Sequence, residues 1–567
     1  MKQQHILVFC LALLCAGAAW PQINLNPAPS RTVGHPVTPQ VEQNALYSAN
    51  PNLVEGRELY QPQGIALDLS STPPAIYVSD TANNRVLGWK DATKFANGQS
   101  ADIVIGQVDF FTTYAQGPGV TPHAPNQGLS LQSGLSAPTG LATRNGDLYV
   151  VDSGNNRVLR FPKPFAKLDH IPDLVIGQQN LSSRGANWTG QVSAQGVFLA
   201  SGSTILQAYI AFDTGGNLWL SDAGNRRVLE FAAADITAAT PAMSAILEIG
   251  QPDMATVQPN LNPNAANSSL TTNQFAVPSG IAFDPQGRLY VSDAEPNSSV
   301  NFSRVLVFQP PFQNAMSASR IMGIFIPPAA GYTAPLLYSY IMNSPTAMFF
   351  DPNGQWMGVV DTGYNRILLF DSYDKWPAAS SSTQVSPKAI GVVGHNGDFA
   401  SLSPNNAPQS AAFVPPPTAS VFANPTAVVF TGTELYLADT SNNRAIVMPF
   451  QSGTVPTFGA ATRALGQARM DTASPNYVEG REFNFYTALS GGTTVDAGVA
   501  IDATGDTPHL YVSDTGNHRI LAFRDMRKIG PGVAADLNPH LRQPTAAPTV
   551  SVASIPLIVF DIAQRWW

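Results

Sequence analysis

Short stretches of alternating apolar and polar residues recur along the chain, each followed by a polar turn and a second apolar stretch. Clear copies are Ile76–Trp89 (IYVSDTANNRVLGW), Leu148–Phe161 (LYVVDSGNNRVLRF) and Leu510–Phe523 (LYVSDTGNHRILAF). Because successive side chains of a strand point to opposite faces, alternation with a period of two predicts β-strands. The Asn residues between the two stretches favour a tight turn, since Asn tolerates the left-handed conformation.

The same phrase occurs seven times, and every copy contains one aspartate and one arginine at fixed places. Consecutive aspartates are 68 to 78 residues apart, so one structural unit of about 70 residues recurs seven times. The fourteen residues are Asp80, Arg85, Asp152, Arg157, Asp222, Arg227, Asp293, Arg304, Asp361, Arg366, Asp439, Arg444, Asp514 and Arg519.

Each unit has two further apolar stretches that complete a set of four strands. A Pro-x-Gly-apolar-Ala phrase precedes the alternating stretch, as in PSGIAF from Pro278, and a stretch ending in Gly-Gln follows it, as in IVIGQ from Ile103. Four short antiparallel strands repeated in this way predict a β-propeller, in which radial repetition protects the strand edges. A solenoid fits less well, because its repeats are roughly 20 to 45 residues long and need polar caps.

We therefore predict an all-β protein with a single propeller of seven four-stranded blades over residues 30–530, followed by a linker and tail of unassigned role at 531–567. No Gly-Gln stretch follows the seventh copy. Near the N-terminus, however, Val33-Gly34-His35 matches Val393-Gly394-His395 of the fifth unit. We expect this N-terminal strand to complete the last blade and close the ring. The pentapeptide VEGRE at Val54–Glu58 also recurs at Val478–Glu482.

The combination of Pro-x-Gly-apolar-Ala, LYVxD and Asn-x-Arg-Val-x-x-Phe resembles the NHL repeat, a propeller-blade motif. The units are longer than NHL repeats usually are, and the excess lies between the Gly-Gln and Pro-x-Gly strands, for instance from Val108 to Ala137. Because the same connection of every blade points the same way, all insertions emerge on one face. This face is the predicted binding surface.

The N-terminus has the layout of a secretory signal peptide over residues 1–19. Lys2 precedes an apolar run of 15 residues from Ile6 to Trp20, shorter than the roughly 20 that span a bilayer. Cleavage after Ala18 or Ala19 would remove both cysteines, Cys10 and Cys15. The expected product is secreted or periplasmic and has no disulfide bonds.

Composition and charge exclude two classes of partner. Charged residues make up 12% of the chain, the formal net charge is −8, and no basic cluster is present, so nucleic acids and anionic membranes are not expected partners. No later segment is long and apolar enough to span a membrane. We expect a monomer.

The repeated Asp and Arg residues have two interpretations, a cation site at the mouth of the channel or a structural pair in each blade. A residue needed identically in every blade serves the blade, which favours the structural interpretation. Aromatic residues in the insertions could stack on sugars or anchor a protein partner. They are Phe110, Phe111, Tyr114, Trp188, Tyr332, Tyr338, Tyr340, Tyr477, Phe483, Phe485 and Tyr486.

We accordingly predict a non-enzymatic scaffold that binds a protein or glycan through the insertion-bearing face, without catalytic residues or a cofactor. The alternative comes from the resemblance, because NHL-like lyases and related six-bladed lactonases assemble metal ligands from several blades. His35 and His395 occupy the Gln place of the fourth strand, and His518 replaces an Asn of the turn. Only His123 lies off the repeat pattern on the insertion side.

Overall fold

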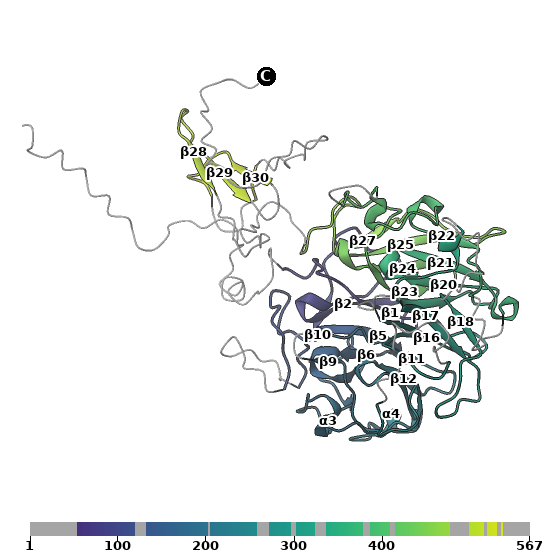
Figure 1. Cartoon of the computed structure of the whole chain (residues 1–567). Helices are drawn as coiled ribbons and strands as arrows, with labels where there is room; N and C mark the ends of the chain where they lie inside the picture. Colours follow the sequence, from purple (N-terminus) through teal and green to yellow (C-terminus); the bar gives the residue numbers. More distant parts are fainter. Residues whose placement is uncertain are drawn as a thin grey trace, which may run out of the picture.

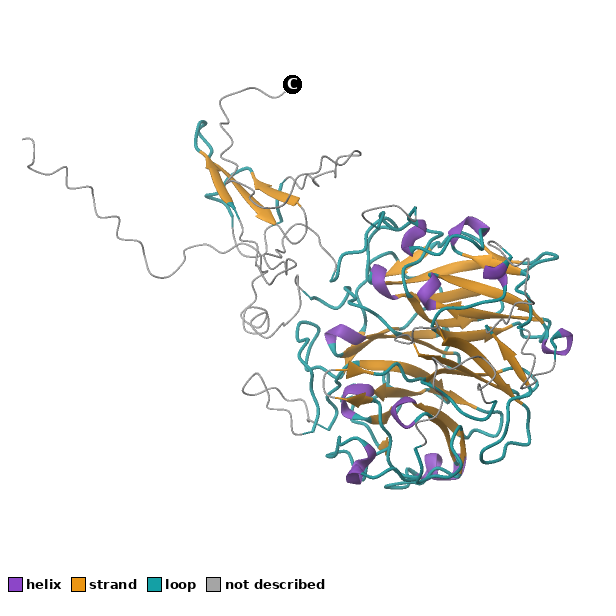
Figure 2. Ribbon diagram, in the orientation of Figure 1, coloured by secondary structure: helices purple, strands orange, loops and turns teal. Residues whose placement is uncertain are grey.

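The computed structural model describes residues 54–118, 132–201, 204–257, 272–295, 302–323, 336–377, 386–408, 414–476, 498–514, 519–529 and 534–536. Its regular structure is almost entirely β-strand (Figure 2), which confirms the all-β prediction. The α-helices of these residues are two short ones, α3 (Asn187–Gly190) and α4 (Ala233–Ala238). No helix in this part of the chain has the length and hydropathy needed to cross a membrane.

Five sheets consist of four antiparallel strands each and a sixth has five; all follow the predicted order, and we number them as blades 1 to 6. Their strands are β1 (Gly64–Asp68), β2 (Ala75–Asp80), β3 (Arg85–Trp89) and β4 (Ile103–Ile105); β5 (Pro138–Arg144), β6 (Asp147–Asp152), β7 (Arg157–Phe161) and β8 (Leu174–Ile176); β11 (Ile210–Phe212), β12 (Leu218–Asp222), β13 (Arg227–Phe231) and β14 (Leu247–Ile249); β15 (Pro278–Phe283), β16 (Leu289–Glu295), β17 (Phe302–Phe308) and β18 (Arg320–Met322); β19 (Pro345–Phe350), β20 (Trp356–Asp361), β21 (Arg366–Asp371) and β22 (Gly391–Val393); β23 (Pro425–Phe430), β24 (Glu434–Asp439), β25 (Arg444–Gln451) and β27 (Arg463–Leu465). In blade 6 the short β26 (Thr457–Phe458) also pairs with β25, and β9 (Ala200–Ser201) and β10 (Thr204–Ile205) form a small separate hairpin.

The repeated turn sets the register between the second and third strands. In blade 1 a 3₁₀ turn over Thr81–Asn83 follows β2, and Asn84 then adopts the left-handed conformation with φ of 55°. This reverses the chain so that Asp80 lies opposite Arg85 in the ladder. Left-handed backbone favours Asn over most residues, which explains why the turn phrase is rich in Asn.

The first strands of the six blades form a closed ring. They pack one on the next in the order β1, β5, β11, β15, β19 and β23, and β23 packs on β1. Hydrogen bonds also join blade 6 to blade 1, because Thr440 Oγ1 donates to Pro62 O at 2.6 Å and Thr426 Oγ1 donates to Gln63 O at 3.1 Å. The ring therefore has six blades; the first strands β1, β5, β11 and β23 are labelled in Figure 1.

The seventh repeat folds as a three-stranded sheet of β28 (Val499–Asp502), β29 (His509–Asp514) and β30 (Arg519–Phe523). It lies outside the ring in Figure 1, and no hydrogen bond between described residues joins it to the six blades. The prediction of seven four-stranded blades in one ring is thus not confirmed, because blade 1 covers the side of blade 6 that a seventh blade would need. The predicted closing strand around Val33 lies outside the described residues.

The hydrophobic core is divided into clusters that lie between neighbouring blades. Between blades 6 and 1, for example, Ile65 and Val78 of blade 1 pack with Ala427 and Val447 of blade 6. Each such cluster buries apolar side chains from two sheets, so a blade depends on both neighbours for its core.

The ring has two distinct faces. On the first face lie the repeated Asp/Arg turns and the insertions that link each blade to the next, and we call it the insertion face. On the second, the opposite face, lie the turns between the first and second strands, such as Asp284–Arg288. The insertions thus emerge together, as the repeat pattern predicted.

Candidate functional site

The repeated Asp and Arg residues form one ion pair within each blade. Asp Oδ2 accepts from Arg Nε at 2.6–2.9 Å in all seven copies, and the side chains of the pairs are completely buried. Burial raises the pKa of the Asp80 carboxyl, and the Arg85 guanidinium opposes that rise. The same two influences act on Asp152, Asp222, Asp293 and Asp361.

The remaining polar atoms of the ring pairs hold the bases of insertions, on both sides of the blade in blades 1, 2, 3, 5 and 6 and on the preceding side in blade 4. In blade 2, Arg157 Nη1 donates to Leu181 O at 2.8 Å and Nη2 donates to Gly134 O at 2.9 Å, while Asp152 Oδ1 accepts from Ser136 N at 2.8 Å. Leu181 lies in the insertion after blade 2, and Gly134 and Ser136 lie in the one before it. In the other ring blades the corresponding Asp Oδ1 likewise accepts a backbone N–H from the preceding insertion. The pairs therefore position the loops that form the insertion face.

The axis of the ring is filled near the insertion face by Tyr209, at the start of blade 3. Its hydroxyl oxygen lies 3.2 Å from both Gln63 O of blade 1 and Thr426 O of blade 6. Tyr209 is only 8% exposed, and burial raises the pKa of its hydroxyl. One side chain thus reaches across the centre and links three blades.

At the opposite face the axis ends in an open cavity of about 480 Å³, lined by the first strands of blades 3 to 6 and by polar residues of the turns that follow them, such as Asp213 and Asp284. The same place in these strands is occupied by Phe212, Phe283, Phe350 and Phe430, whereas blade 2 has Thr143 there. This side of the ring is therefore not sixfold symmetric.

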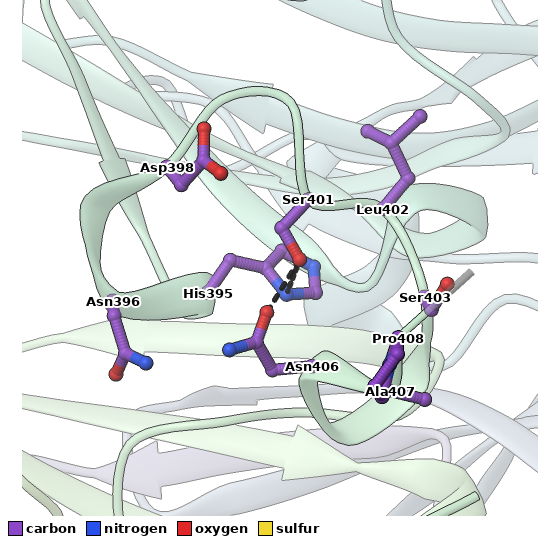
Figure 3. Close-up of a pocket in the computed structure, with 9 residues that line it drawn as sticks. All are labelled: His395, Asn396, Asp398, Ser401, Leu402, Ser403, Asn406, Ala407 and Pro408. Carbon is purple, nitrogen blue, oxygen red and sulfur yellow. Dashed lines mark hydrogen bonds between the residues drawn. The ribbon is translucent and has the colours of Figure 1, made fainter. Parts of the chain in front are cut away.

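Blade 5 carries the clearest departure from the repeat on the insertion face (Figure 3). In blades 1, 2, 3 and 6 the Gln after the fourth strand donates from Nε2 to the carbonyl of the residue before the repeated Arg, as Gln107 does to Asn84 O. His395 replaces this Gln and is bonded through Nε2 to Tyr364 O at 2.9 Å. The acceptor is one residue earlier than in the other blades, because Asn365 is the residue before the repeated Arg366, so His395 still bonds to the turn but at a shifted position.

The other ring nitrogen of His395 faces a polar cavity of about 380 Å³ that includes Asp398, Ser401 and Asn406. With Nε2 donating to the carbonyl, Nδ1 is the acceptor, and it lies 3.3 Å from Ser401 Oγ. The Ser401 hydroxyl has one proton, which it donates either to Nδ1 or to Asn406 Oδ1. Burial lowers the pKa of His395, which keeps the imidazole neutral at pH 7. The cavity therefore offers hydrogen-bonding groups to a polar ligand.

The other predicted residues are distributed as follows. Phe110, Phe111, Tyr114, Trp188, Tyr338 and Tyr340 are half-buried on the insertion face, and Tyr338 packs edge-on against Tyr364 at 5.9 Å between ring centres. Tyr332, Tyr477, Phe483, Phe485, Tyr486, His35, His123 and His518 lie outside the described residues. Within the described ranges no three His, Cys, Asp or Glu side chains are grouped closely enough to hold a metal ion.

Sequence reasoning missed Tyr209 and Ser401. Tyr209 lies just before β11, in a segment that lacks the Pro-x-Gly signature, and nothing in its neighbours indicates a side chain that crosses the axis. Ser401 lies six residues after His395 in an irregular loop, so no periodicity places it beside the imidazole.

Comparison with known proteins supports the repeat. Residues 135–161 match the NHL repeat, which confirms the predicted resemblance in blade 2. No curated protein matches the chain. Similar solved structures include a streptogramin B lyase (11% identity, 72% of this chain and 86% of that chain covered, TM-score 0.33) and the periplasmic gluconolactonase of Pseudomonas aeruginosa (13%, 73% and 86%, 0.37). A third is the hydrazine synthase of Kuenenia stuttgartiensis (11%, 71% and 97%, 0.38). Similarity at this level carries no information about activity.

Proposed function

We propose that this chain of NHL repeats is an exported propeller that binds a protein or glycan ligand through its insertion face without transforming it. The observation that carries this proposal is the use made of the repeated ion pairs. In the ring, the Asp and Arg side chains form hydrogen bonds with the backbone at the bases of the loops. Arg157, for example, binds the loops at Leu181 and Gly134. The repeated Asp and Arg residues thus hold the loops in place, and the loops themselves make the contacts with the ligand.

Fixed loop bases favour binding because a preorganised surface loses less conformational entropy when a ligand docks. The cavity beside His395 adds hydroxyl, amide and carboxylate groups at one place on this face. Such groups match the hydroxyls of a glycan or the main chain of a protein partner.

A glycan array followed by calorimetry with any oligosaccharide that binds tests the proposal. Asn396 lines the cavity on the insertion face, and Asn353 lies in a turn of the opposite face; both are exposed. We expect Asn396→Lys to weaken binding at least tenfold and Asn353→Lys, its matched control, to leave the affinity unchanged. Equal losses in both variants, or binding unaffected by either, would place the ligand elsewhere.

The alternative function is that of a metal-dependent lyase or lactonase, the kind of activity named for two of the similar structures. It requires at least three His, Asp or Glu side chains from different blades around one metal ion. Elemental analysis of the purified protein, combined with a lactone-hydrolysis assay before and after a strong chelator, distinguishes the two functions. Stoichiometric metal together with chelator-sensitive turnover would favour the enzyme.

A further inference from the structure

The seventh repeat carries an apolar face that nothing among the described residues covers. Val499 and Ile501 of β28 are 67% and 54% exposed. Aligned on the repeat, they correspond to Ile65 and Leu67 of β1, which are 5% and 6% exposed. Two equivalent strands with similar side chains thus differ only in whether another sheet lies against them.

In the ring, this place in the first strand packs on the preceding blade. Leu141 of blade 2 lies in the cluster shared with blade 1, Ile281 of blade 4 in the cluster shared with blade 3, and Met348 of blade 5 in the cluster shared with blade 4. The face formed by Val499 and Ile501 therefore matches the side of the repeat that precedes it in the chain, which is blade 6.

Blade 1 covers the side of blade 6 on which the next repeat in the chain would pack. Its contacts with blade 6 are of the same kind as those between consecutive blades. Leu59, just before blade 1, packs over Gly466 of blade 6, as Phe422 packs over Gly394 and Leu135 over Gly106. The backbone at Gly466 has φ of +86°, and a Cβ there would come within 2.8 Å of Leu59.

Two pairs of asparagines show in the same way that blade 1 occupies the place of the next repeat. Asn405, in the insertion before blade 6, donates to Asn442 of the blade 6 turn at 2.9 Å. Asn476, in the insertion after blade 6, pairs with Asn83 of blade 1 at 2.7 Å instead of with the next repeat in the chain. Blade 1 thus makes the contacts that the seventh repeat would make in a ring of seven.

The sequence before each of the two competitors is also the same. VEGRE at Val54–Glu58 precedes blade 1, and VEGRE at Val478–Glu482 precedes the seventh repeat. From these equivalences we infer that the seventh repeat docks on blade 6 in place of blade 1. The sheet β28–β30 enters the ring between blades 6 and 1, and the chain has a second closed form with seven blades.

Docking of the seventh repeat changes the axis of the ring. Tyr209 bridges Gln63 O of blade 1 and Thr426 O of blade 6, which are neighbours only in the six-bladed form. Entry of a sheet between these blades separates the two carbonyl groups, so Tyr209 can no longer reach both. The exchange therefore opens the axis toward the insertion face.

Thiol labelling of the full chain carrying Cys10→Ser and Cys15→Ser tests the inference, because these are its only cysteines. Val499→Cys reports on docking, and Leu69→Cys is the matched control, since Leu69 is 66% exposed in a turn of blade 1. Each labelling rate is divided by the rate of the same variant unfolded in urea. On this scale we expect Val499→Cys to react at least tenfold more slowly than Leu69→Cys. Equal rates would overturn the inference.

A second variant ties any protection of Val499→Cys to the boundary between blades 6 and 1. Ile501→Asp places a charge on the apolar face of β28, where Ile501 is 54% exposed, and so prevents this face from being buried between blades 6 and 1. In that chain we expect Val499→Cys to react as fast as Leu69→Cys; persistent protection would overturn the inference. Light scattering must show a monomer throughout, because protection found only in a dimer would assign the face to a second copy.

Discussion

The six ring blades and the seventh repeat share their local structure and differ in their surroundings. Asp514 pairs with Arg519 at 2.6 Å, as Asp80 pairs with Arg85 at 2.7 Å, and both repeats form the same antiparallel ladder across the turn. Yet Ile65 is buried against blade 6 while its counterpart Val499 is exposed. The comparison shows that the repeated phrase specifies a strand-turn-strand unit by itself, whereas membership of the ring depends on which other sheet covers each face.

Removing the arginine from a ring pair and from the seventh pair should give very different results. Arg157→Ala leaves Asp152 buried without its cation and removes the clamp on two insertions, so we expect a loss of about 3–5 kcal/mol in the free energy of unfolding. In the six-bladed form, Arg519→Ala should unfold only the outlying sheet and change the stability of the ring by less than about 0.5 kcal/mol, whereas a seventh repeat docked on blade 6 would pass the loss on to the ring. Denaturant unfolding followed by tryptophan fluorescence reports on the ring, where Trp89 and Trp219 are buried. Equal losses would show that the seventh repeat is part of the ring's cooperative unit.

The sequence was sufficient for the local unit and insufficient for the closure of the ring. The Asp-x-x-Asn-Asn-Arg phrase predicts the turn, the ladder and the common face of the insertions because each depends on residues close together in the chain. The number of blades in the ring depends on whether blade 1 or the seventh repeat packs on blade 6. The same VEGRE sequence precedes both, so the local sequence does not distinguish them. Likewise, the side chain of Tyr209 contacts Gln63, 146 residues away, which no local pattern predicts.

The ring blades also differ among themselves, and Glu248 offers a test of that difference. It lies in β14 at a place where other blades have Val104, Val175 or Val392, it is fully buried, and its nearest cation is Arg227 Nη1 at 3.6 Å. Neither carboxylate oxygen has a hydrogen-bond partner among the described residues. Burial raises the pKa of Glu248 to about 7.

We expect Glu248→Val to stabilise the ring at high pH. A carboxyl with a raised pKa in the folded state binds its proton more tightly than in the unfolded state, where the pKa is about 4.3. Its contribution to stability is therefore fully present below that value and is lost as the pH rises to about 7. Between pH 4 and pH 8, denaturant unfolding should show a loss of stability for the wild type that is about 3–4 kcal/mol larger than the loss for Glu248→Val. The same slope in both proteins would show that Glu248 is ionised and solvated.

Two glycines, one in the ring and one in the seventh repeat, allow the two regions to be compared by substitution of the backbone position. Gly466→Ala introduces a Cβ at positive φ, 2.8 Å from both Asn443 O and Leu59, and should cost about 1–2 kcal/mol by loosening the contact between blades 6 and 1. Gly505→Ala in the seventh repeat meets no atom within 4 Å and should be neutral. Thermal unfolding of the two variants side by side measures the difference. An unchanged melting temperature for Gly466→Ala would mean that Leu59 does not pack there.

The smallest expected effect comes from Tyr209→Phe, which removes one hydroxyl from the axis. Neither of its carbonyl partners is left without a donor, because Gln63 O also accepts from Thr426 Oγ1 at 3.1 Å and Thr426 O accepts from Thr346 Oγ1 at 2.7 Å. The cost should therefore be about 0.5–1 kcal/mol, the net value of a single hydrogen bond. Tyr511→Phe in the seventh repeat is the control and should leave the unfolding of the ring unchanged. Since the hydroxyl of Tyr209 reaches both carbonyls only when blades 1 and 6 are neighbours, a measurable loss indicates the six-bladed ring, and no loss indicates that the axis is open.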